Sequence, residues 1–104
     1  MEFKNATVSA KANIYFDGKV VSHAVILENG EKKTFGMIYP GEYKFSTSAA
    51  EKMEIISGNS KVCIEGSTEW IDYNEGTYFD VPANSSFKIK VESGLTEYVC
   101  SYIS

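Results

Sequence analysis

Short apolar stretches that alternate with polar residues recur along this chain, and Gly, Asn and Asp residues separate them. In residues 42–47, Tyr43, Phe45 and Thr47 occupy one face of an extended segment, and charged or hydroxyl-bearing residues occupy the other. A period of two residues indicates a half-buried β-strand. Stretches of this kind, spaced roughly 8–12 residues apart with turn residues between them, predict an all-β sandwich or barrel.

The same pattern places the strands and the turns. The expected strands lie at residues 20–28 (a strand pair or one bent strand), 34–38, 42–47, 53–57, 61–65, 69–73, 77–81, 86–92 and 96–103. Asn29-Gly30 predicts a hairpin with a type I′ turn, and only residues 47–53 have the composition of a helical turn. Residues 1–12 are weakly patterned, so we expect a loose N-terminal arm before one domain at residues 13–104.

Charge and composition exclude several classes of protein. The net charge is −4, and all 10 basic residues are Lys. A chain without Arg lacks the planar fork most used for phosphate and guanine recognition. An acidic chain with no basic cluster is not expected to bind nucleic acid. One His and two Cys cannot form a Cys₄, Cys₂His₂ or His₃ zinc site.

The sequence also predicts a cytoplasmic location. Residues 1–12 lack the apolar centre of a signal peptide, and no apolar run approaches the roughly 20 residues that a membrane span needs. We therefore expect no membrane partner. Cys63 and Cys100 lie in apolar strand patterns, so we expect both to be reduced and buried.

Two segments resemble the paired motifs of the cupin barrel. Residues 76–87 follow the pattern Gly, five residues, Pro, one residue, Gly, two residues, His: Gly76 and Pro82 match, Asn84 replaces the second Gly, and Phe87 stands in the position of the metal-binding His. Both Asn and Gly tolerate left-handed turns, so the frame of this motif is retained.

The other cupin pattern is His, one residue, His, three or four residues, Glu, six residues, Gly. Glu51 and Gly58 match its spacing, whereas Phe45 and Thr47 stand where the two His would be. A lone Glu is a poor transition-metal site. The resemblance therefore implies a single-domain, jelly-roll type, cupin-like β-barrel of roughly 8–10 strands, which uses no metal and no other cofactor.

A longer set of motifs narrows the resemblance. The set consists of Tyr15-Phe16-x-Gly18-Lys19-Val20, Gly41-Glu42-Tyr43-x-Phe45-Ser46-Thr47, Met53-x-Ile55-Ile56-Ser57-Gly58, Trp70-x-x-Tyr73-x-x-Gly76-x-x-Phe79-x-Val81-Pro82 and Tyr98-x-Cys100-x-Tyr102. Over residues 13–103 the chain resembles the bacterial pyrimidine/purine nucleoside phosphorylase family. That resemblance implies phosphorolysis of purine and pyrimidine nucleosides, such as uridine and adenosine, to free base and ribose 1-phosphate. We also expect a homodimer, because C₂ is the commonest oligomer symmetry.

Phosphorolysis through an oxocarbenium-like transition state needs a phosphate cradle, a charge stabiliser and a donor for the leaving base. By the resemblance, Glu51 and Thr47 are the expected catalytic residues. Side chains expected to bind substrate are Tyr43, Phe45, Phe79 and Phe87, as an aromatic slot for the base, and Lys19. The remaining cradle candidates are backbone N–H groups, Lys44 and Ser46. The alternation points the side chains of Lys44 and Ser46 away from the interior. We expect the pocket between residues 43–47 and 86–89.

Simpler interpretations remain open for each residue. Inward aromatic residues are more often core, Thr47 would suit a turn cap, and both Glu51 and Lys19 would suit solvated turns. Two alternative functions also remain: a non-catalytic, metal-free cupin that binds a nucleoside, sugar or phosphate ligand, and a structural barrel whose dimer surface is its function.

Overall fold

The structure, a computed structural model, describes residues 1–103, which form eleven β-strands and one 3₁₀ turn. In chain order these are β1 (Thr7–Val8), β2 (Asn13–Tyr15), η1 (Phe16–Gly18), β3 (Val20–Ile26), β4 (Lys32–Ile38), β5 (Gly41–Ser46), β6 (Ala50–Ser57), β7 (Asn59–Ile64), β8 (Ile71–Asn74), β9 (Tyr78–Val81), β10 (Ser86–Val91) and β11 (Thr96–Ile103). The described residues contain no helix long and apolar enough to cross a membrane.

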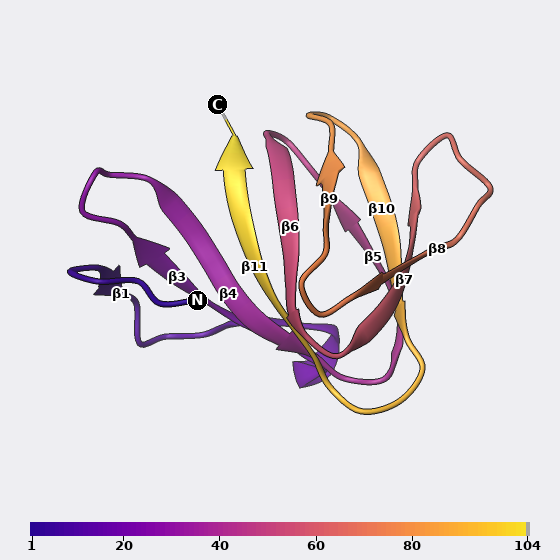
Figure 1. The fold of residues 1–104 in the computed structure, drawn as a ribbon, viewed down its shortest axis with the longest axis horizontal. Helices are drawn as coiled ribbons and strands as arrows, with labels where there is room; N and C mark the ends of the chain where they lie inside the picture. Colours follow the sequence, from indigo (N-terminus) through magenta and orange to yellow (C-terminus); the bar gives the residue numbers. More distant parts are fainter. Residues whose placement is uncertain (104) are drawn as a thin grey trace.

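The strands form two antiparallel sheets that face each other (Figure 1). The larger sheet has the order β1-β3-β4-β11-β6-β9, with β2 also paired to β3, and the smaller sheet has the order β5-β10-β7-β8. Among the described residues β5 pairs only with β10, so the barrel is not closed at that edge. The expected all-β, single-domain architecture is confirmed as an open two-sheet sandwich.

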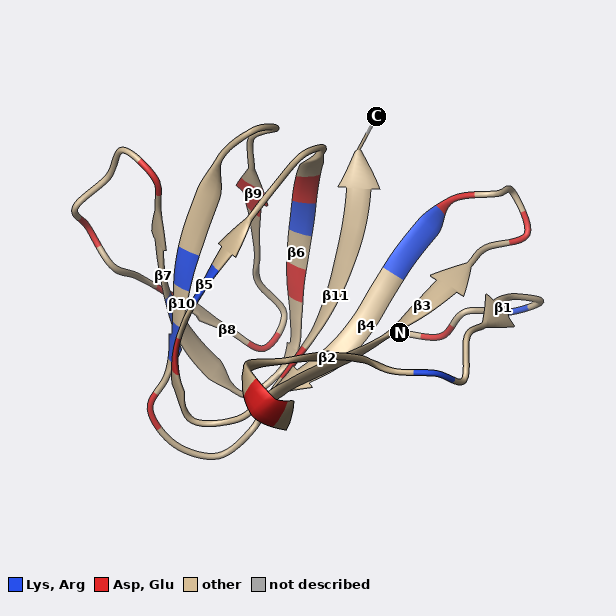
Figure 2. Cartoon of the chain, turned by 180° about the vertical axis from the view of Figure 1, so that it is seen from behind, with Lys and Arg blue, Asp and Glu red and all other residues tan. Residues whose placement is uncertain are grey.

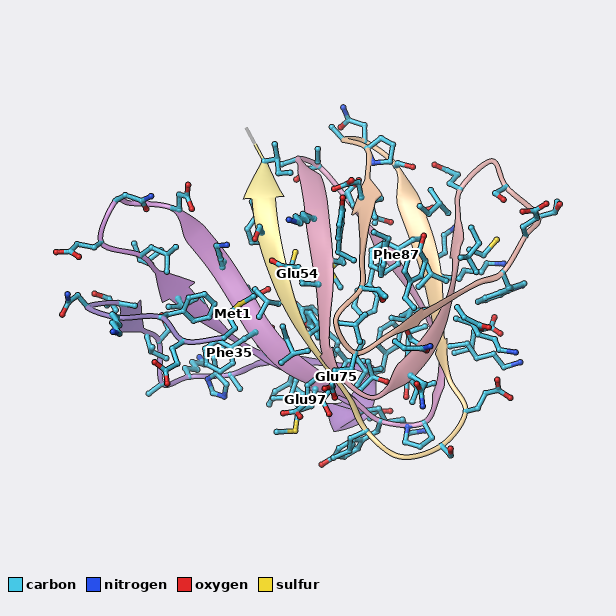
Figure 3. The ribbon with its side chains drawn as sticks, in the orientation of Figure 1. Met1, Phe35, Glu54, Glu75, Phe87 and Glu97 are labelled. Atoms are coloured by element: carbon cyan, nitrogen blue, oxygen red, sulfur yellow. The ribbon has the colours of Figure 1, made fainter. Side chains whose placement is uncertain are left out.

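An apolar core fills the space between the sheets. On β10, Phe87, Ile89 and Val91 are buried, and the lysines between them are exposed. Because side chains of a strand alternate between its two faces, one face of β10 enters the core and the other faces solvent. Phe87 lies between the sheets (Figure 3), with its ring centroid 5.4 Å from that of Phe79 on β9. Each fully buried side chain of this size stabilises the fold by about 1.5–3 kcal/mol.

The structure corrects two local expectations. Residues 47–53 form no helical turn, because β6 begins at Ala50 and continues to Ser57 through pairing with β11 and β9. The hairpin at Asn29-Gly30 is present, but its turn is not type I′. Gly30 has a φ of 90°, whereas Asn29 is not left-handed; the Asn29 side chain instead accepts a hydrogen bond of 2.9 Å from the N–H of Glu31.

The N-terminal segment is attached to the larger sheet through β1. β1 pairs with β3, with Thr7 opposite Ile26 and Val8 opposite Val25. That residues 1–12 behave as a loose arm stays a prediction, as does its division from a domain at residues 13–104.

Gly58 connects β6 of the larger sheet to β7 of the smaller sheet, and we predict that its replacement destabilises the fold. It has a φ of 90°, and an added Cβ would clash with the carbonyl oxygen of Leu95. Gly30 has the same φ with open space around it. Gly30→Ala should therefore cost about 1–2 kcal/mol of unfolding free energy from backbone strain alone. Gly58→Ala should cost clearly more, because the clash adds to the strain. Denaturant unfolding of both variants measures the difference, and equal losses would contradict the steric argument.

Candidate functional site

A cavity of about 430 Å³ lies between the two sheets. β3, β4, β6 and β11 of the larger sheet, β5 and β10 of the smaller sheet, and the segment formed by β2 and η1 all contribute side chains to it. Since β5 has no neighbour on its outer side within residues 1–103, the cavity reaches the open edge of the smaller sheet.

The wall formed by the larger sheet carries a row of polar groups, with Ile38 and Met53 beside them. Tyr98, Cys100 and Tyr102 alternate along β11 and present three polar groups to the cavity, and Ser22 and Thr34 lie beside them on β3 and β4. Cys100 is directly opposite Thr34 in the sheet register. Burial raises the pKa of the Tyr98 phenol well above its ordinary value of 10, while a hydrogen bond with Ser22 acts in the opposite direction. These groups therefore face the cavity as neutral hydrogen-bonding partners.

Glu51 is the one carboxylate among the described residues that lines the cavity. It is half-buried, and the Cys100 thiol donates a hydrogen bond of 3.5 Å to its Oε1. Burial raises the pKa of Glu51 above its ordinary value of 4.5, and the bond from Cys100 only partly offsets this. Burial, together with the adjacent Glu51 charge, raises the pKa of the Cys100 thiol to about 12. The environment thus shifts the Glu51 carboxyl toward its protonated form and keeps the Cys100 thiol neutral.

The wall formed by the smaller sheet is aromatic and centres on Phe45. Its ring stacks on that of Phe87 with centroids 5.6 Å apart and an interplanar angle of 27°. Phe16 and Tyr15 meet Phe45 edge-on, at 5.5 Å and 6.0 Å. Offset and edge-to-face pairs are the favourable arrangements of aromatic rings. The cavity therefore combines a flat aromatic surface with a wall of polar groups.

Phe16 is held in a strained backbone conformation where it contributes to this aromatic wall. Its φ is 51° and that of Asp17 is 57°. A bulky residue in the left-handed region is a conformational outlier, and such outliers persist where the surrounding structure enforces them, often at ligand sites. Phe16 is still 45% exposed, so its own burial offsets little of that cost.

The structure brings three of the residues expected at the site together in the cavity: Glu51, Phe45 and Phe87. The other four do not line it. Tyr43 and Phe79 are buried in the core, and the Tyr43 hydroxyl donates to the carbonyl oxygen of Tyr39 at 2.8 Å. Lys19 is exposed at the end of η1.

Thr47 points inward, and its hydroxyl is fully used in holding a turn. It donates to the carbonyl oxygen of Pro82 at 2.7 Å and accepts from the N–H of Ser85 at 3.0 Å. This contact ties the end of β5 to the turn before β10. The predicted pocket position also changes: β5 and β10 are neighbours in one sheet, and the cavity lies over their inner face.

Sequence reasoning missed several cavity residues. It gave no role to Tyr15, Phe16, Ser22, Thr34, Tyr98, Cys100 and Tyr102, and it pointed Lys44 and Ser46 away from the interior, although both line the cavity. A signal was available for part of this set, because Tyr98-x-Cys100-x-Tyr102 places three polar side chains on one face of a strand. Ser22 on β3 and Thr34 on β4 can be identified as cavity residues only once the order of strands in the sheet is known.

The cavity does not fit the metal ion of metal-binding cupins. The rings of Phe45 and Phe87, which stand in two of the three His positions, stack on each other, and the Thr47 hydroxyl in the third is engaged by Pro82 and Ser85. Glu51 is the remaining ligand of that pattern, and its contact is with a neutral thiol. A transition metal would require several further donors at this point.

The fold and the cavity define a small cupin-like protein whose cavity is lined by aromatic, hydroxyl and carboxyl groups. The cupin-like fold is supported by a likeness to Bacillus subtilis oxalate decarboxylase, which has a TM-score of 0.74 at 17% identity and covers 98% of this chain and 30% of that one. A protein of unknown function from Acinetobacter sp. ADP1 is much more similar, with a TM-score of 0.95, 43% identity and 98% coverage of both chains.

The family follows from sequence similarity over nearly the whole chain. The family model for pyrimidine/purine nucleoside phosphorylases matches residues 10–102. A pyrimidine/purine nucleoside phosphorylase of Clostridioides difficile (strain 630) is 52% identical over 103 residues, which cover 99% of this chain and 97% of the relative. One from Syntrophotalea carbinolica is 49% identical, over 98% and 97% of the two chains. The chain belongs to the pyrimidine/purine nucleoside phosphorylase family.

We predict that Glu51→Gln stabilises the protein in a pH-dependent way. The folded state binds the Glu51 proton more tightly than the unfolded state does, because burial raises the pKa above 4.5. Stability is therefore lost as the pH rises from about 4.5 through the raised pKa. Gln cannot ionise, so the variant should unfold at a higher temperature than the wild type at pH 7 and lose this advantage near pH 4.

Glu54→Gln is the matched control, since Glu54 lies on the opposite face of β6 from the cavity (Figure 3). Thermal unfolding from pH 4 to pH 8 measures both variants. A gain from Glu51→Gln that is the same at every pH would contradict the role of burial.

Proposed function

We infer that this chain is a nucleoside phosphorylase, which converts a purine or pyrimidine nucleoside and phosphate to the free base and ribose 1-phosphate. Membership of the family supports this reaction. The observation that carries it in the structure is a half-buried carboxyl with a raised pKa, placed in a cavity that also has an aromatic wall. An acid and a flat apolar surface are what departure of a nucleobase requires.

The base is proposed to lie against Phe45 and Phe87. Stacking on aromatic side chains tolerates every base, because each base has a π-face. This supports a broad substrate range that includes uridine and adenosine. The aromatic edges of Tyr15 and Phe16 would then border the base on the side of η1.

The ribose is proposed to face the polar wall. Tyr98, Tyr102 and Thr34 can each both donate and accept hydrogen bonds, as ribose hydroxyls also do. Burial keeps both phenols protonated, since it raises the pKa of Tyr98 and of Tyr102. Hydroxyl groups held in place on a sheet would orient the sugar, so that its anomeric carbon is presented to the attacking phosphate.

Glu51 is proposed to act as the general acid. As the bond between the anomeric carbon and the base breaks, the base takes the electron pair and accepts the Glu51 proton. A phosphate oxygen bonds to the same carbon, and the proton that hydrogen phosphate loses restores the acid. A carboxyl whose pKa is raised by burial is suited to this transfer.

Glu51→Gln tests the reaction and the role of the acid together. We expect kcat to fall about 100-fold or more, the usual contribution of a positioned general acid. Glu54→Gln should retain the wild-type rate. Chromatography of reactions with inosine or uridine, with and without phosphate, measures release of the base.

Each alternative has its own outcome in this assay. Base release that is equal in wild type and Glu51→Gln would indicate contaminating host phosphorylases or a different acid. Saturable nucleoside binding without base release would favour a non-catalytic binding cupin over the proposed enzyme.

We also propose that the protein works as a cytoplasmic homodimer. Both cysteines are free thiols, as expected in a reducing compartment. The open sandwich has edge strands, and large apolar side chains such as Met37, Tyr39 and Leu95 are at least 44% exposed. A partner copy would cover exposed apolar groups of this kind.

A further inference from the structure

The cavity has groups suited to bind a base and a sugar, but few that are suited to bind a phosphate. The chain has no Arg, and Lys44 is the one cationic residue among those described that lines the cavity. Phosphate groups in proteins are commonly held by backbone N–H groups as well as by cationic side chains. The open edge of β5 provides both.

The register of β5 determines which of its N–H groups are free. The N–H of Thr47 donates to the carbonyl oxygen of Ser85 at 2.9 Å, and Phe45 lies opposite Phe87. In an antiparallel pair, alternate residues bond to the neighbouring strand. The odd residues of β5 therefore bond to β10, and the N–H groups of Lys44 and Ser46 point the other way. Because β5 has no second neighbour among the described residues, these N–H groups face the open edge.

This geometry explains why Lys44 and Ser46 line the cavity although their side chains lie on the outer face of the sheet. They reach it over the edge of the strand, next to Phe45. The two N–H groups are roughly 7 Å apart along the strand, with the Lys44 carbonyl between them, so each is a separate donor that an anion at the sheet edge can use.

A second observation concerns the lysines beside this edge. Lys44 lies directly opposite Lys88 on β10. The two residues form a pair without backbone hydrogen bonds between them, and in such pairs the opposed side chains come closest. Figure 2 shows the basic segments of β5 and β10 next to each other. Like charges directly opposite each other destabilise a sheet. In residues 1–103 the one ion pair joins Lys61 to Glu92, so no carboxylate neutralises the pair Lys44–Lys88.

We propose that the open edge of β5 binds the phosphate that takes part in the reaction. The Lys44 ammonium and the outward N–H of Ser46 hold its oxygens, and the Lys88 ammonium adds positive potential from the neighbouring strand. The inference rests on the proposed phosphorolysis and assigns its second substrate to a place in the structure. Phosphate at this edge sits next to the aromatic wall, on the open side of the cavity.

Replacement by Pro tests the backbone donors. Ser46→Pro removes one N–H that faces the edge, and Pro is tolerated in edge strands where the N–H faces outward. Glu42→Pro is the matched control, since Glu42 has the same orientation on β5 but does not line the cavity. We expect Ser46→Pro to raise KM for phosphate about 10-fold, as for one lost hydrogen bond to a charged group. KM for the nucleoside should stay within about twofold in both variants.

Replacement of each lysine by Gln tests its ammonium group and leaves the backbone hydrogen bonds between β5 and β10 in place. Lys44→Gln and Lys88→Gln should both raise KM for phosphate and also raise the unfolding temperature, because either change removes the like-charge repulsion. Lys90→Gln, on the same face of β10 but away from the cavity, should leave KM for phosphate unchanged. A KM for phosphate that is unchanged in Lys44→Gln and in Ser46→Pro would overturn the proposal, as would an equal increase in KM for the nucleoside.

A binding measurement separates this proposal from the proposed reaction. Titration of the wild type with inorganic phosphate, followed by amide NMR, should shift the N–H signals of Lys44 and Ser46 more than that of Glu42. Shifts at these amides without base release would support the anion site and contradict phosphorolysis. Base release without such shifts would support phosphorolysis and place phosphate elsewhere.

Discussion

The register of β5 on β10 is the constraint on which the site depends. Phe45 lies opposite Phe87 and stacks on it, and Phe87 also packs against Phe79 in the core. A slip of one residue would turn every buried side chain of β5 to solvent, so the core fixes this register. The same register decides that Phe45 faces the cavity while the N–H groups of Lys44 and Ser46 face the open edge. Core packing and the proposed phosphate site thus have one common cause.

Much of the fold could be predicted from local patterns. The alternation of Phe87, Ile89 and Val91 with lysines identifies β10 with nearly its observed bounds, and the same holds for most other strands. Local patterns were wrong at the start of β6, where pairing with two neighbours overrides a composition that suits a turn. The order of the strands depends on contacts between distant segments. It was therefore not predicted: the likeness to cupins gave the class of fold, and the strand order comes from the structure.

The site was less predictable, for two physical reasons. The spacing of the cupin motifs singled out Glu51, Phe45 and Phe87, which the structure brings to one cavity. Cys100 donates to Glu51 from a strand 49 positions further along the chain, a contact that no local pattern contains. Side-chain alternation pointed Ser46 outward. Alternation describes only the direction of side chains, however. Ser46 lines the cavity because β5 is an edge strand, and that position depends on the order of strands in the sheet.

Several features around the cavity reduce stability. Phe16 is in a left-handed conformation, Glu51 is a partly desolvated carboxyl, and Lys44 opposes Lys88. An exposed edge strand explains a lysine, since a charge there prevents pairing with other chains. It does not explain a second lysine directly opposite the first, because that arrangement adds repulsion and gives no further protection to the edge. A repulsive pair beside free N–H groups is better accounted for by an anion that binds there, since binding would remove the repulsion and use the donors at once.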